Sequence, residues 1–260
     1  MAAFDCWADY YDLIHEGLPG DAEFYVGQAV RHGGPVLELG SGTGRIAILM
    51  AMSGLDVTGL DNSPAMLERC REKMGAIGPT KGSVSLVCAN MARFELDARF
   101  PFIAMPYRAF MHLLTPEDQR GSLAAVHRHL ADDGVFILDS WAATPTAIVT
   151  VLGAPEAGQP KRIGRYPLPG RKEAVVHYCA VSCDEFHQRI IETHVIQEVD
   201  ARGNVLDEVR LPLVRVWTTP REMDNLVRLC GFNVVDVLGG FDGFPFTPAS
   251  TEMIWVLKKA

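Results

Sequence analysis

The stretch VLELGSGTGR, residues 36–45, joins a short apolar run to three glycines, with the acid Glu38 inside the run. Glycine loses more backbone entropy on folding than any other residue, so each glycine should have a reason: a positive φ angle or a close approach by another group. A turn that leads from a strand into a helix and lies against a ligand supplies both reasons. The turn residues that we expect near the ligand are Gly40, Ser41, Gly42 and Gly44.

A second acid, Asp61, follows the next apolar run, LDVTGL, residues 55–60. Ligands of open α/β sheets bind at the carboxyl ends of the strands, and an acid roughly 20 residues beyond the glycines accepts hydrogen bonds from ribose hydroxyls. Asp61 therefore predicts a nucleotide-like ligand whose ribose lies at the end of this strand.

Two kinds of cofactor are compatible with the glycine turn. Residues 42–47 formally satisfy the G-x-G-x-x-G/A fingerprint of dinucleotides, through Ala47. The longer pattern E-x-G-x-G-x-G begins at Glu38, and this acid would repel a pyrophosphate but suits a cofactor with an amino group and a sulfonium. A nicotinamide (NAD)-dependent oxidoreductase therefore remains an alternative that Glu38 disfavours.

Alternating strands and helices are expected to position these groups. Continuous apolar runs predict strands at residues 35–39, 55–60, 83–88, 101–106 and 134–139. Capped or amphipathic segments predict helices at residues 5–16, 21–32, 45–52, 64–74 and 116–130. This alternation is typical of the α/β class, and it predicts a Rossmann-like three-layer sandwich around a mostly parallel, seven-stranded sheet.

The pattern changes after residue 141. Residues 142–170 are rich in Pro, Gly and Ala and are expected to form a loop. Three β-rich runs then predict an antiparallel β insert; they are residues 173–181, 189–199 and 205–217, with DARGN, residues 200–204, as a hairpin turn. We assign residues 1–140 and 218–260 to the core and residues 141–217 to the insert, which would roof a substrate pocket, form a homodimer interface, or both.

The core resumes with a helix at residues 220–230 and strands at residues 232–238 and 252–258. No helix fits between these two strands, so the last strand should run antiparallel.

Composition excludes several classes of partner. The chain has 260 residues and a net charge of −8 without a basic cluster, so nucleic acid is not expected to bind. No apolar run approaches the roughly 20 residues that cross a bilayer. The first residues do not resemble a signal peptide, so we expect no membrane association and a cytoplasmic location. The six cysteines are scattered and no metal-ligand spacing is visible, so we expect free thiols and no metal.

The residues from Val36 to Lys73 resemble the first motifs of the class I S-adenosylmethionine (SAM)-dependent methyltransferases. The antiparallel last strand also matches that fold. The insert, together with YYDLIHEG (residues 10–17) and DSWAATP (residues 139–145), is similar to the small-molecule N-methyltransferases of amino-sugar type.

This resemblance implies roles for individual residues. Glu38 would organise the methionyl amine of SAM, and the glycines would pass close to the cofactor. Asp61 and Asn62 would hold the ribose, while Asn90 and Met91 would flank the adenine, although many relatives have an Asp near position 90. The first helix would close over the cofactor and place Tyr11 near the transferred methyl group.

Methyl transfer from a sulfonium is an in-line displacement, so the protein mainly aligns the nucleophile and keeps it unprotonated. His112, in MPYRAFMHLL (residues 105–114), is the candidate base because imidazole titrates near neutrality. A histidine that faces solvent at a helix start is the alternative. The residues expected to contact the methyl acceptor are Tyr107, Arg108, Trp141 and His194. For His194, which alternates with Glu192 on one strand face, a solvated outer face is the alternative.

The sequence therefore predicts a SAM-dependent methyltransferase that acts on an N, O or S nucleophile of a small molecule and releases S-adenosylhomocysteine (SAH). An amine acceptor is favoured, and thiol or hydroxyl acceptors stay open. A non-catalytic SAM-binding protein would carry the same cofactor motifs and is a further alternative.

Overall fold

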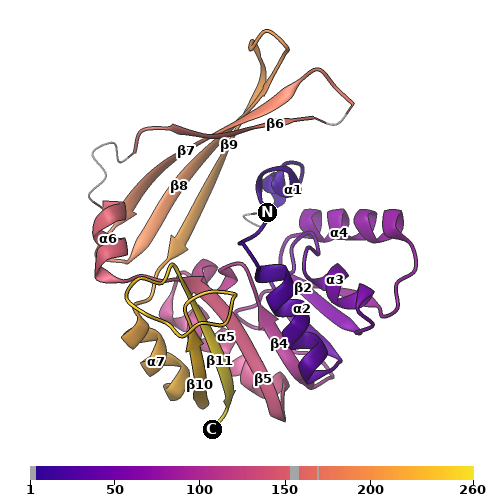
Figure 1. The fold of residues 1–260 in the computed structure, drawn as a ribbon, viewed down its shortest axis with the longest axis vertical. Coiled ribbons are helices and arrows are strands. Elements are labelled where there is room, and N and C mark those ends of the chain that lie inside the picture. Colours follow the sequence, from indigo (N-terminus) through magenta and orange to yellow (C-terminus); the bar gives the residue numbers. More distant parts are fainter. Residues whose placement is uncertain (1–3, 153–157, 169) are drawn as a thin grey trace.

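The computed structural model describes residues 4–152, 158–168 and 170–260. Figure 1 shows a core that contains a large sheet covered by helices, with a second, smaller sheet standing above one end of the core. The N-terminal segment lies between these two parts (Figure 1).

The core sheet has seven strands in the order β10-β11-β5-β4-β1-β2-β3. Their bounds are β1 Val36–Leu39, β2 Val57–Asp61, β3 Val84–Cys88, β4 Phe100–Met105, β5 Leu130–Trp141, β10 Phe232–Leu238 and β11 Glu252–Lys259. Neighbours among β1 to β5 pair in parallel, whereas β11 is antiparallel to both β5 and β10. The predicted Rossmann-like fold and the antiparallel last strand are confirmed.

Alternate residues of each central strand pack on opposite faces of this sheet, because successive side chains of a strand point to opposite sides. On β4, Phe102 and Ala104 pack in a buried cluster with helices α2 (Asp21–His32) and α3 (Ala47–Met52). Ile103 and Met105 pack on the other face with α5 (Pro116–His129) and α7 (Pro220–Leu229). Two apolar layers therefore enclose the sheet, which explains why its strands are apolar throughout.

Capping residues mark the start of three helices where the sequence predicts them. Ser63 accepts a hydrogen bond from the backbone N–H of Met66 at the start of α4 (Pro64–Ile77). Thr115 does the same for α5, and Thr219 forms a capping box with Glu222 at α7. In each case a proline follows the capping residue, where its fixed φ suits the first helical position.

The prediction of one helix at residues 5–16 is wrong. The segment forms a short 3-10 helix, Asp5–Trp7, and a single turn, α1 (Tyr11–Ile14). Trp7 and Ile14 are buried against Val175 and Ile196 of the second sheet. Tertiary contacts of these large side chains therefore replace the regular helix.

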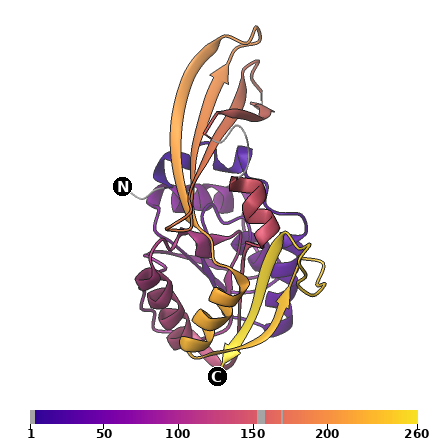
Figure 2. The ribbon, with the colours of Figure 1, turned by 90° about the vertical axis from the view of Figure 1, so that its left-hand side faces the viewer.

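The second sheet has four antiparallel strands in the order β6-β7-β8-β9. They are β6 Lys161–Pro167, β7 Ala174–Asp184, β8 Arg189–Val199 and β9 Val205–Val216, and the turn at residues 200–204 joins the last two as predicted. Figure 2 shows this sheet as a tall, twisted layer that rises from the core. The division of the chain into core and insert, and the role of the insert, remain predictions.

The expectation of a loop over residues 142–170 is also wrong. Helix α6 (Pro145–Leu152) lies in this range, and Thr144 accepts a hydrogen bond from the N–H of Ala147 near its start. The edge strand β6 follows at residues 161–167, and a cluster of polar and breaker residues hides it in the sequence. Residues 153–157 and 169 of the expected loop lie outside the described residues.

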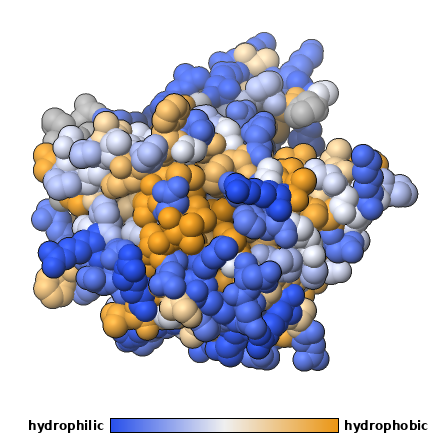
Figure 3. Space-filling model, turned by 60° about the horizontal axis from the view of Figure 1, so that its bottom comes forward, coloured by the Kyte–Doolittle hydropathy of each residue, from blue (hydrophilic) through white to orange (hydrophobic). Residues whose placement is uncertain are grey.

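The core also carries an apolar patch. Figure 3 shows hydrophobic residues gathered near the middle of one face, with hydrophilic residues around them. Such patches are common at protein interfaces, and the homodimer remains a prediction. None of the helices in the described part of the chain is long and apolar enough to cross a membrane.

Candidate active site

A cavity of about 580 Å³ lies between the core sheet and the second sheet. Its floor is formed by residues that follow or end the parallel strands, including Gly40 after β1, Asp61 at the end of β2 and Pro106 after β4. Its roof comes from β8 and β9 of the second sheet, and the N-terminal segment closes one side. The volume is that of a typical small-molecule site.

Most of the predicted site residues line this cavity. Tyr11, Gly40, Gly42, Asp61, Asn62, Asn90, Met91, Tyr107, Arg108, His112 and His194 are among its lining residues. The sheet thus brings together groups that are far apart in the sequence.

Asp61, the last residue of β2, forms a hydrogen bond with the glycine turn that follows β1. Its two carboxylate oxygens accept hydrogen bonds from the N–H groups of Gly42 and Ser63, at 2.9 Å each. Burial raises the pKa of Asp61, and these hydrogen bonds oppose that rise. Gly42 has a φ of +54°, which a side chain would strain. Each carboxylate oxygen can still accept a second hydrogen bond, as a ribose hydroxyl would require.

Glu38 is buried on β1, and its Oε2 has no hydrogen-bond partner among the described residues. Burial raises the pKa of Glu38 to about 8, although the nearby Arg45 cation opposes the rise. Arg45 itself is held by Asp21 through two hydrogen bonds of 2.8 and 2.6 Å. An unpartnered buried carboxylate oxygen is costly. Glu38 lies behind the residues that line the cavity, and a cofactor amine that reached this oxygen would satisfy it, so the residues present fit SAM.

Four predicted site residues do not line the cavity: Glu38, Ser41, Gly44 and Trp141. Ser41 belongs to the glycine turn, and it is buried. A Cβ at Gly44 would lie 2.3 Å from Sγ of Cys70, so the close approach there is to α4. Trp141 packs beside Met111 and Trp217, where core and insert meet, and not against the cavity. The positions of glycines and strand ends in a sequence do not show whether a residue packs inside the protein or contacts a ligand. For this reason the prediction included residues that do not line the cavity.

Asn90 and Arg108 have other partners as well. Oδ1 of Asn90 accepts a hydrogen bond from the N–H of Ala92 at 2.8 Å, so this oxygen has one lone pair left for an adenine amino group. The guanidinium of Arg108 pairs with Glu252 on β11. The charge of Arg108 is therefore largely neutralised before any acceptor binds.

The loop after β4 has an unusual backbone. Tyr107 and Arg108 have φ angles of +57° and +60°, which are uncommon outside glycine and cluster at functional sites. The buried Asp139 holds this loop by accepting the N–H of Arg108 at 2.8 Å, and its other oxygen accepts the hydroxyl of Tyr25 at 2.6 Å. Asp139 thus positions the loop from beneath.

His112 ends the short 3-10 helix Ala109–His112 that follows this loop. Burial and the Arg215 cation lower the pKa of His112 to about 4, while a hydrogen bond to the backbone of Val214 opposes the shift. Its ring lies edge-on to Phe4, with ring centres 5.1 Å apart. His112 is therefore a neutral imidazole at physiological pH. The alternative of a solvent-facing histidine is wrong, because His112 lines the cavity.

Aromatic residues form one wall. The rings of Tyr11 and His15 lie 4.8 Å apart, and the Tyr107 hydroxyl is 3.3 Å from Nδ1 of His15. Burial raises the pKa of Tyr11 and lowers that of His15 to about 4. Sequence reasoning missed His15, although it belongs to the quoted YYDLIHEG motif.

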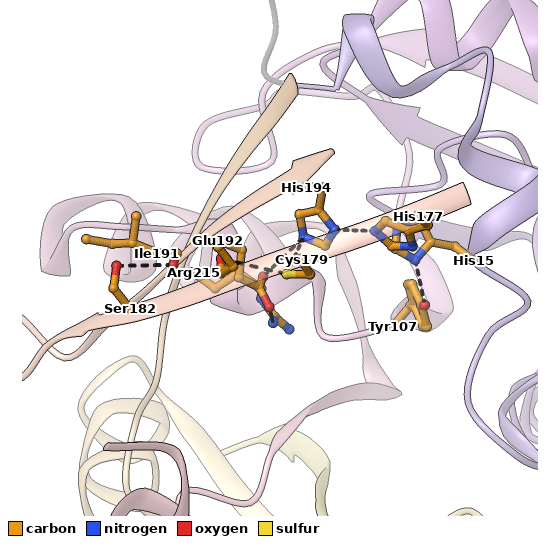
Figure 4. Close-up of polar contacts among 10 residues, drawn as sticks. His15, Tyr107, His177, Cys179, Ser182, Ile191, Glu192, His194 and Arg215 are labelled. Atoms are coloured by element: carbon orange, nitrogen blue, oxygen red, sulfur yellow. Dashed lines mark hydrogen bonds and ion pairs between the residues drawn. The ribbon is translucent and has the colours of Figure 1, made fainter. Parts of the chain in front are cut away.

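The roof carries an ion pair that faces the cavity. Glu192 accepts two hydrogen bonds from Arg215, at 3.1 and 2.6 Å, and His194 lies beside them (Figure 4). Glu192 and His194 are only 8% and 7% exposed, so the alternative of a solvated outer face is wrong. Arg215 was missed because a register shift between Glu198 and Val199 moves the predicted hairpin pairing by one residue, which puts Arg215 on the same face as Glu192.

The glycine turn and Asp61 at the strand ends, with a second sheet above them, define a Rossmann-like α/β fold with a roofed cavity. Residues 36–134 match a family model described as a methyltransferase domain. A cypemycin N-terminal methyltransferase from Streptomyces sp. is 26% identical over 227 residues, which cover 87% of this chain and 84% of that protein.

Solved structures extend the similarity along the whole chain. The CcbJ methyltransferase from Streptomyces caelestis has a TM-score of 0.80 and 25% identity, and the match covers 99% of this chain and 98% of that one. CalS10, an amino pentose methyltransferase from Micromonospora echinaspora whose structure contains SAM, shares the fold, with a TM-score of 0.64, 19% identity and coverage of 100% and 92%.

Residues 36–134 therefore match a methyltransferase domain, and the chain as a whole is similar to methyltransferases, as its motifs indicate. These findings do not support the oxidoreductase alternative, since the matched family and relatives are methyltransferases.

Proposed function

We propose that this protein transfers the methyl group of SAM to the amine nitrogen of a small molecule. The observation that carries the proposal is the cavity itself, in which Asp61 on the floor and His112 on the wall share one enclosed space. The names of the relatives support an amine acceptor, because one methylates an N-terminus and another an amino pentose. The net charge of −8 disfavours a nucleic-acid acceptor.

SAM, when bound, supplies an activated methyl group, so the protein residues have to align the acceptor and remove a proton. Alignment of two reactants contributes roughly 7–11 kcal/mol to lowering such a barrier. The backbone of Val214 forms a hydrogen bond with one nitrogen of the His112 imidazole, so the other ring nitrogen is available as a proton acceptor. The amine lone pair would form the new N–C bond as the methyl C–S bond breaks and SAH leaves, and His112 would accept the proton that the amine nitrogen then loses. Tyr11, Tyr107 and Phe4 exclude water around it.

The acceptor atom can be tested with three compounds that share one carbon skeleton and carry an amine, a hydroxyl or a thiol. Release of SAH from SAM is measured with the purified protein. We expect the amine to react at least about tenfold faster, because two of the named relatives methylate an N-terminus and an amino pentose, and a site shaped for one acceptor discriminates by such factors. Turnover of the thiol or the hydroxyl alone would refute the amine proposal. Tight SAH binding without turnover of any acceptor would favour the non-catalytic alternative.

Cofactor binding is expected to release nearly one proton from Glu38 at pH 7. The carboxyl has a pKa of about 8 before binding, and it must ionise to pair with the methionyl ammonium. SAH affinity should therefore rise as the pH approaches 8. Calorimetry in two buffers with different protonation enthalpies measures the released proton. The variant Glu38→Gln should show weaker binding and no release, and a buffer-independent heat for the unchanged protein would contradict this role.

A further inference from the structure

Three side chains of types that can bind a metal ion lie close together in the roof of the cavity. Their spacing in the sequence does not indicate that they are neighbours. Cys179 on β7 and Glu192 and His194 on β8 offer one ligand atom each, and these atoms all lie within 4.8 Å of one another. Cys179 and His194 are direct partners in the strand register, and Glu192 lies two residues before His194, on the same face. All three are buried.

We propose that Cys179, Glu192 and His194 bind a divalent transition-metal ion, with Zn²⁺ as the best match. Sulfur, nitrogen and carboxylate oxygen are the ligands that zinc takes in proteins. Nε2 of His194 lies 3.8 Å from Sγ of Cys179 and 3.8 Å from Oε2 of Glu192. Zinc bond lengths in a tetrahedron require about 3.3–3.6 Å between such atoms. The two pairs that include His194 therefore need to close by about 0.2–0.5 Å, and the third pair, Cys179 with Glu192, starts within 4.8 Å.

The surroundings of the cluster match what metal ligands require. Nδ1 of His194 is 2.8 Å from Nε2 of His177, and Figure 4 shows the two rings side by side. This hydrogen bond can hold the tautomer in which Nε2 of His194 is free to bind an ion. Arg215 donates to both oxygens of Glu192, and Oε2, which accepts the longer hydrogen bond of 3.1 Å, keeps a second lone pair for the ion. The carboxylate can therefore bridge the ion and the guanidinium.

Binding would form three protein–metal bonds and release the thiol proton of Cys179 to solvent. Glu192 and His194 line the cavity, so the ion enters from there and its fourth position faces the acceptor compartment. A water molecule or a heteroatom of the acceptor would complete the tetrahedron, as in zinc sites that keep one open position.

The test uses the full chain, freed of metal with a chelator and titrated with Co²⁺ alone, which replaces zinc and absorbs visible light. We expect one bound Co²⁺ per chain, a tetrahedral d–d spectrum, a thiolate-to-cobalt charge-transfer band, and displacement by Zn²⁺. The Cys179→Ser variant should lose the charge-transfer band and bind at least about 100-fold more weakly. Cys183→Ser, on the same strand but outside the cluster, should behave like the unchanged protein.

The variant His177→Ala should keep the charge-transfer band but lose about 10–100-fold in Co²⁺ affinity, since it removes only the partner of a ligand. SAH titration shows that each variant is folded. The proposal is overturned if the unchanged, SAH-binding protein gives no cobalt spectrum, or if the charge-transfer band survives in Cys179→Ser.

Discussion

Replacing His112 with alanine is expected to lower turnover by about tenfold. This is less than the roughly 10²–10⁴-fold that a general base with a pKa near the operating pH contributes, because a pKa of about 4 makes His112 a weak base. The imidazole lines the cavity, and its low pKa of about 4 keeps it unprotonated over the physiological range. It can therefore accept a proton from the acceptor whenever the acceptor binds. The alanine variant loses this proton acceptor and keeps the cofactor-binding floor, so its affinity for SAH should change little.

Steady-state kinetics with a saturating acceptor, together with a calorimetric SAH titration, measure both effects. His187→Ala is the matched control, because His187 is an exposed histidine that pairs with Asp184 in the turn between β7 and β8 and does not line the cavity. Its turnover should equal that of the unchanged protein. Unchanged turnover in His112→Ala would remove His112 from the reaction.

The variant Asp61→Ala is expected to bind SAH at least about tenfold more weakly. The carboxylate accepts the N–H groups of Gly42 and Ser63 at 2.9 Å, and it lines the cavity where the ribose is expected. Hydrogen bonds to a charged group contribute about 1.5–3 kcal/mol each, and about 1.4 kcal/mol corresponds to a factor of ten in affinity. Loss of one ribose bond therefore suffices for this change, and a loosened glycine turn would add to it.

Calorimetry with SAH checks this prediction, and Asp56→Ala is its control. Asp56 precedes β2 at the opposite end of the strand and accepts a hydrogen bond from Ser83 at the surface. Its loss should leave SAH affinity unchanged. Equal affinity in Asp61→Ala and the unchanged protein would show that Asp61 does not hold the cofactor.

Local sequence signals predicted most of the fold. Helix α2 and strand β8 have the bounds that the sequence indicates, residues 21–32 and 189–199. Capping residues, prolines and apolar periodicity act within a few residues of each other, so they can be recognised without tertiary structure. The failures are the segments at residues 5–16 and 142–170, where buried aromatic contacts and an edge strand override or hide those signals.

The sequence by itself predicted most residues on the floor of the cavity, because they follow the ends of consecutive strands, which a parallel sheet places at one edge. Only the tertiary structure decided the acceptor half. Arg108 pairs with Glu252 across 144 residues, and Glu192 meets Arg215 across 23. The first pair depends on the strand order of the whole sheet, and the second depends on a register shift within the β8–β9 hairpin, which the local pattern does not show. The register of β7 and β8 brings Cys179 beside His194 and creates the proposed metal site.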